Sequence, residues 1–164
     1  MDLLKLVRSM LVGLVLLTLV SSAAMAGNTA NQTVTFEVQA INEVAVSGNP
    51  AALIVNSATA GSEPVLVSDA STTYDITTNG TNKKITAAIN TNMPANVTLT
   101  AALAAPTGGT SAGDTTLSTV AANVVTAITQ KAETAKTITY KLSATVAAGV
   151  VVSDTKTVTL TLTD

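Results

Sequence analysis

The chain has 164 residues, with eight basic and ten acidic side chains and a net charge of −2 at pH 7. It contains no His, no Cys and no Trp. Ser-His-Asp and Cys-His catalytic arrangements, zinc and copper sites and disulfides are therefore excluded. A nucleic-acid binder needs a basic face and stacking aromatic side chains, and the sequence offers neither. We expect no enzyme, no cofactor and no nucleic-acid partner.

The N-terminus has the layout of a cleavable signal peptide. A basic stretch that ends at Arg8 precedes an apolar run, residues 10–20, and the small-residue site Ala24-Met25-Ala26. We expect residues 1–26 to be removed, leaving one secreted domain, residues 27–164. An uncleaved membrane anchor is the alternative, but the run is about half the ~20 residues that span a bilayer. No stable membrane span is expected after cleavage.

The first expected strand comes early in the mature chain and alternates with period two. Its apolar positions are Val34, Phe36, Val38 and Ala40, with polar residues between them. Such alternation indicates a strand with one buried face. The register breaks at residues 41–42 and then resumes, which predicts a bulge or bend.

Further strands are expected along the rest of the chain. Asn79-Gly80 lies between two alternating runs and predicts a β-hairpin, because both central positions of a type I′ turn need positive φ. Residues 56–69 are expected to be mostly irregular, and residues 106–113 to form a flexible loop. Residues 121–128 are ambiguous between a strand and a helical turn. The expected strands cover residues 33–46, 52–55, 72–78, 84–89, 97–103, 136–146 and 155–163.

These segments predict an all-β fold. Seven or eight strands, with turn signals between them and no long amphipathic helix, favour a single antiparallel immunoglobulin-like β-sandwich.

Acidic and aromatic side chains offer the remaining chemistry. Glu37 with Glu43, and Asp69 with Asp75, are conceivable carboxylate pairs, although solvated surface charge is the simpler reading. A calcium site would need the fold to gather separate aspartates, since no clustered ligand loop exists. The aspartates concerned are Asp69, Asp114 and Asp154. The aromatic residues Phe36, Tyr74 and Tyr140 lie in alternating runs and are expected in the core rather than on a sugar-binding surface.

Two features of the layout carry a resemblance to known proteins. One is the long alternating segment that follows the signal peptide, residues 32–46. The other is the pair of alternating strands near the C-terminus, residues 137–146 and 156–163. This pattern resembles small exported β-sandwich proteins of the spore-coat U type, donor-strand pilins and TasA-type matrix filament subunits. The resemblance implies assembly by β-strand donation, in which Val34, Phe36, Val38 and Ala40 form the candidate donor strand.

The functional expectation follows from the missing chemistry and this resemblance. We expect a non-catalytic structural subunit of an extracellular or cell-surface filament, such as a pilus or biofilm matrix. Its partners would be copies of itself, added head to tail. The alternative is a monomeric periplasmic or surface module for binding or adhesion, with an unknown ligand.

Overall fold

A computed structural model describes residues 28–164, so the expected signal peptide, residues 1–26, lies outside the described residues. The chain divides into two units at Glu37, and the unit from Val38 to Asp164 contains both sheets. Within that unit the protein is all-β, as expected from the sequence. A single turn of 3-10 helix, η1, spans Val146–Ala148. The strands are β1 (Asn42–Val46), β2 (Val67–Thr78), β3 (Lys83–Ile89), β4 (Val97–Leu103), β5 (Thr110–Ser111), β6 (Thr115–Thr116), β7 (Ala122–Ile128), β8 (Lys131–Ala144) and β9 (Val158–Thr163).

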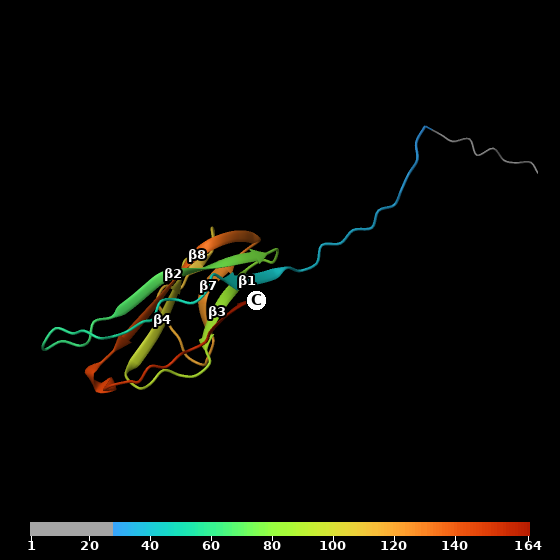
Figure 1. Ribbon diagram of the computed structural model, residues 1–164. Helices are drawn as coiled ribbons and strands as arrows, with labels where there is room; N and C mark the ends of the chain where they lie inside the picture. Colours follow the sequence, from blue (N-terminus) through green and yellow to red (C-terminus); the bar gives the residue numbers. More distant parts are fainter. Residues whose placement is uncertain (1–27) are drawn as a thin grey trace, which may run out of the picture. The chain divides into compact units, whose positions relative to one another are not determined.

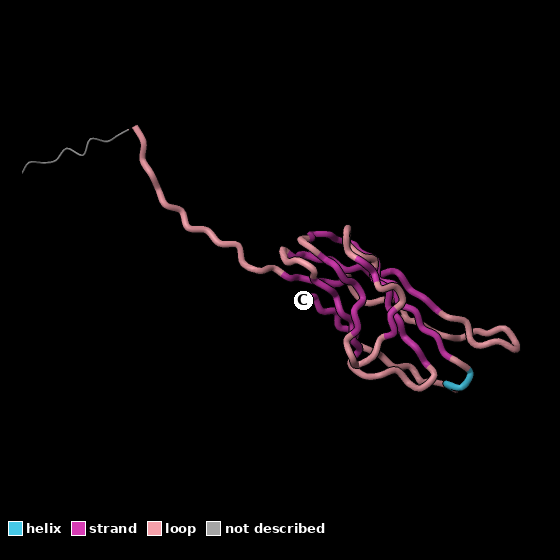
Figure 2. The backbone as a smooth tube through the Cα atoms, turned by 180° about the vertical axis from the view of Figure 1, so that it is seen from behind, coloured by secondary structure: helices cyan, strands magenta, loops and turns pink. Residues whose placement is uncertain are grey.

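The strands form two antiparallel sheets. The five-stranded sheet has the order β1-β2-β8-β4-β6, and the four-stranded sheet has the order β5-β7-β3-β9. Figure 1 shows the long strands β2 and β8 side by side with β4. Figure 2 shows the strands of this unit in magenta and the loops that connect them in pink. β8 is the centre of its sheet because it pairs along its length with β2 on one side and β4 on the other.

Both sheets contribute to one apolar core. Alternate residues of each strand point into it, as the period-two pattern predicts. The two tyrosines, Tyr74 of β2 and Tyr140 of β8, are 0% and 7% exposed, so their assignment to the core is confirmed. Ile85 of β3 and Ile138 of β8 are fully buried in the same cluster. The small aliphatic residues of the core include Ala87, Ala101, Val124 and Val125.

The expected hairpin at Asn79-Gly80 is wrong. β2 and β3 lie in different sheets, so residues 79–82 cross from one sheet to the other instead of joining paired strands. Gly80 does not have positive φ, and the left-handed residue of this connection is Asn82, with φ 52°. The side chain of Asn79 forms hydrogen bonds with the backbone of Gln39 and Ile41, in the segment before β1, and does not form part of a hairpin turn.

Several other expectations are corrected. Residues 33–40 form no strand, and neither do residues 52–55. The ambiguous segment is strand β7. β2 begins earlier than expected, at Val67, and β8 begins at Lys131. Alternation shows that a segment suits a strand, but a strand also needs a neighbouring edge with which to pair.

Candidate assembly site

The candidate donor residues lie in a segment whose apolar side chains face solvent. Val34 is 75% exposed, Phe36 is 88% exposed and Val38 is 80% exposed, and Ala40 is exposed as well. The expectation that Phe36 belongs to the core is therefore wrong. The segment keeps an apolar face on alternate residues, although residues 28–41 form no strand.

Asn79 anchors the chain just before β1. Its side-chain amide donates to the Gln39 carbonyl at 2.8 Å, and its Oδ1 accepts the Ile41 N–H at 2.9 Å. The Asn79 backbone N–H also donates to the Ile41 carbonyl at 3.2 Å. These three bonds fix the direction of residues 39–41. Sequence reasoning missed this role because it assigned Asn79 to a turn.

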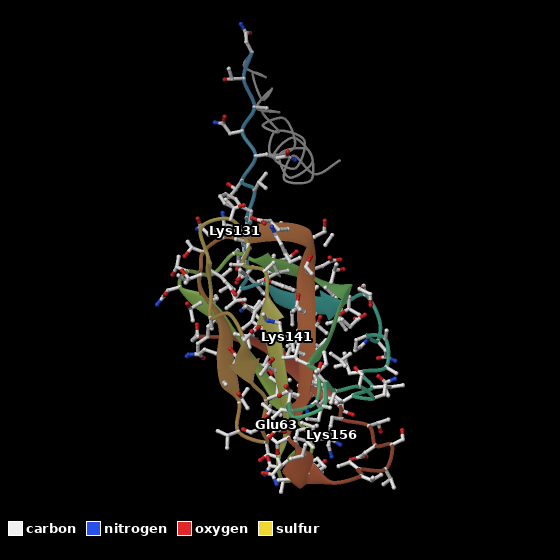
Figure 3. The ribbon with its side chains drawn as sticks, turned by 90° about the vertical axis from the view of Figure 1, so that its left-hand side faces the viewer. Glu63, Lys131, Lys141 and Lys156 are labelled. Carbon is white, nitrogen blue, oxygen red and sulfur yellow. The ribbon has the colours of Figure 1, made fainter. Side chains whose placement is uncertain are left out.

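A large groove opens beside the core in the unit from Val38 to Asp164. Its volume is about 1580 Å³. It is lined by residues of β1, β2, β4, β8 and β9 and by two irregular segments, residues 48–58 and 148–157. Figure 3 shows both irregular segments on the same side of the sheets, near Glu63 and Lys156. The lining residues from the strands are Val44, Ala45, Val46, Thr72, Val97, Leu99, Ile138, Tyr140, Leu142, Ala144, Val158, Thr159 and Leu160.

The groove also gathers exposed apolar side chains. Thirteen large hydrophobic residues are exposed in the described part of the chain, and six of them line the groove. Val150 is 100% exposed and Val152 is 82% exposed. The other four are Val46, Ile54, Val146 and Val151. Exposed apolar residues gathered in one concave surface are typical of a binding site.

Thr72 adds an unsatisfied polar group to the groove wall. The residue is 4% exposed, and its Oγ1 is buried with no hydrogen-bond partner among residues 28–164. A buried hydroxyl without a hydrogen-bond partner destabilises the folded state by about 1–3 kcal/mol.

β9 presents an open edge to the groove. Asn90 donates its N–H to the Thr157 carbonyl at 3.1 Å, and the Thr157 N–H donates to Asn90 Oδ1 at 3.0 Å. The register with β3 continues from this pair without a bulge. In an antiparallel pair, alternate residues direct their backbone groups toward the partner and away from it. Val158, Leu160 and Leu162 therefore direct their N–H and C=O groups to the side that β3 does not occupy.

Charged side chains near the groove are engaged with one another. Lys156 Nζ lies 2.7 Å from Asp154 Oδ2 and 2.9 Å from Thr91 Oγ1. The hydrogen bond from Lys156, together with the Thr155 N–H, lowers the pKa of the Asp154 carboxyl below its ordinary value. The groove is thus lined mainly by apolar side chains, with one ion pair at its rim.

Three of the acidic residues singled out in the sequence, Asp69, Asp75 and Asp114, have separate local roles. Asp69 accepts from the Ser71 hydroxyl at 2.8 Å, and Asp75 accepts from the Ala135 N–H at 2.8 Å. Asp114 pairs with Lys141 at 2.5 Å. Within residues 28–164, no three acidic side chains lie close enough together to hold a metal ion.

Residues 28–164 include no helix with the length and hydropathy to cross a membrane. No protein-family profile matches the chain, and no curated protein or solved structure is significantly similar to it.

Proposed function

We propose that the protein is a non-catalytic structural subunit of an extracellular or cell-surface filament or matrix, assembled by β-strand donation. The observation that carries this proposal is the segment at residues 33–40. It has the alternation of a strand, forms no strand in the described chain, and exposes Phe36 almost completely. An extended segment of this kind can complete the sheet of a neighbour through main-chain hydrogen bonds. Repetition of one head-to-tail contact then produces an open filament.

Export by a cleaved signal peptide and an immunoglobulin-like β-sandwich are parts of the same proposal. Two antiparallel sheets around one core support the sandwich at the level of its layers. The likeness does not extend to strand order. In the immunoglobulin sheet of strands A, B, E and D, the fifth strand lies between the second and the fourth. Here β8 lies between β2 and β4.

Phe36→Asp tests strand donation. Phe36 is exposed, so the substitution should change the stability of the isolated subunit by no more than about 0.5 kcal/mol. In a filament the same change removes about 1.5–3 kcal/mol of apolar burial and places a charge in an apolar site at a cost of several kcal/mol. We expect association to weaken at least about a thousandfold.

Thr35→Asp is the matched control, because it places the same charge on the polar face of the same segment. Light scattering and negative-stain microscopy of the exported protein measure assembly, and circular dichroism measures folding. Filaments from the wild type and from Thr35→Asp, with folded monomers from Phe36→Asp, are expected. Equal assembly of all three proteins would contradict strand donation. A wild type that stays monomeric at high concentration would favour the monomeric binding module.

A further inference from the structure

We propose that the groove beside β9 is the acceptor site, and that its occupant is residues 33–40 of a second copy of this chain. The inference rests on the proposed strand-donating function and identifies the surface that completes it. The inserted segment adds to the open edge of β9 and covers the exposed apolar side chains that line the groove.

The distribution of exposed apolar residues supports this pairing. Of the thirteen large hydrophobic residues that are exposed in the described chain, six line the groove and three are Val34, Phe36 and Val38. Nine of these thirteen residues therefore lie in one segment and one concave surface. Inserting the segment into the groove of another copy removes both from water at once.

The polar groups of the groove match a backbone rather than a small molecule. The edge of β9 offers N–H and C=O groups at every second residue, which is the spacing of an added strand. The groove volume of about 1580 Å³ also exceeds the roughly 300–1,000 Å³ that is common for small-molecule sites.

The anchor at Asn79 favours a second copy over the chain's own segment. The groove is lined by the end of β1, at Val46, whereas residues 33–40 precede its start, at Asn42. Neither Asn79 nor any of residues 39–41 lines the groove. The three hydrogen bonds that Asn79 makes with Gln39 and Ile41 hold residues 39–41 in that place, so they oppose a rearrangement that would bring the segment into the groove of its own subunit.

Complementation between two defective subunits tests the assignment. The donor-defective chain carries Phe36→Asp and keeps the groove intact. The acceptor-defective chain carries Val152→Lys, at a groove residue that is 82% exposed, so its fold should be retained. Val120→Lys is the matched control, because Val120 is 74% exposed and does not line the groove.

Each defective chain should be monomeric alone, and the Val120→Lys chain should polymerise like the wild type. A mixture of the two defective chains should give a one-to-one heterodimer and nothing longer, because only one donor and one acceptor remain intact. Light scattering after size-exclusion chromatography measures these masses.

Amide hydrogen exchange gives a second test that leaves the groove unaltered. A synthetic peptide of residues 32–41 is added to the full chain carrying Phe36→Asp. At a peptide concentration of 100 times Kd, exchange at Val158 and Leu160, the outward-facing β9 residues that line the groove, should slow about a hundredfold. The threonine amides of β9, which already bond to β3, should change much less.

The outcomes separate the two proposals. If Phe36→Asp blocks assembly while Val152→Lys polymerises normally and the β9 amides stay unprotected, the segment is donated to another surface and the acceptor assignment is wrong. If Phe36→Asp leaves assembly unchanged, strand donation itself is wrong.

Discussion

Thr72→Val isolates the energetic role of the unsatisfied hydroxyl in the groove. Thr72 is 4% exposed and its Oγ1 has no partner within residues 28–164. The substitution replaces the hydroxyl with a methyl group of similar size and keeps the β-branched shape that suits a strand. Removing a buried unpaired hydroxyl should stabilise the subunit by about 1–3 kcal/mol. The melting temperature should rise by roughly 3–10 °C.

The assay is urea unfolding, followed by circular dichroism, in chains that also carry Phe36→Asp so that only the monomer is present. The midpoint should move to higher urea without a change in slope. Thr98→Val on β4, at an exposed position, should change stability by no more than about 0.5 kcal/mol. A loss of about 1 kcal/mol or more with Thr72→Val would refute the reasoning, because it would mean that the hydroxyl is already paired in the monomer.

Two further predictions concern pH. Burial, with a smaller contribution from the charge of Glu133, raises the pKa of Tyr74 to about 12, and its hydroxyl donates to the Ala104 carbonyl at 2.7 Å. The unfolded chain ionises first, so stability should fall as pH rises above about 10, the ordinary value for Tyr. Tyr74→Phe should cost about 0.5–1.5 kcal/mol at pH 7 and reduce this alkaline loss, as measured by urea midpoints between neutral and alkaline pH. The hydrogen bond from Lys136, with a further bond from the Thr107 N–H at 2.9 Å, lowers the pKa of Glu133. Its contribution should be complete above the ordinary Glu pKa of about 4.3 and lost as pH falls through the lowered value; Glu133→Gln should flatten that acid limb of the stability profile, and an unchanged acid limb would count against the pairing.

The alternating pattern predicted strands best in segments that have one face in the core and the other face toward solvent. β4 matches the expected residues 97–103, and β3 begins one residue before its expected start. β8 begins five residues before its expected start, at Lys131, and ends two residues before its expected end, at Ala144. The same pattern predicted a strand over residues 33–40 that the described chain does not form. Period-two alternation reports how a segment would sit in a sheet, and it carries no information about whether an edge is available in the same subunit.

The sheet order and the groove could not be obtained from local sequence. Asn79-Gly80 has the composition of a hairpin turn, but the hydrogen bonds of Asn79 to Gln39 and Ile41 depend on residues about forty positions away. The groove is assembled from β8, β9 and two irregular segments that share no motif. The proposed donor segment, residues 33–40, follows from an alternating pattern in the sequence. The proposed acceptor groove is formed by residues that are far apart in the sequence, so no local pattern predicts it.

The strand order also limits the order in which the strands can pair during folding. β2 has β8 as its long partner, and β3 has both β7 and β9, so most pairings join residues that are dozens of positions apart. Loop closure on this scale slows folding relative to hairpin-rich topologies. A nascent chain that ends before residue 131 contains β2 without β8, and one that ends before residue 158 contains β3 without β9. Such intermediates expose strand edges, and they would depend on chaperones or rapid completion of synthesis to avoid aggregation.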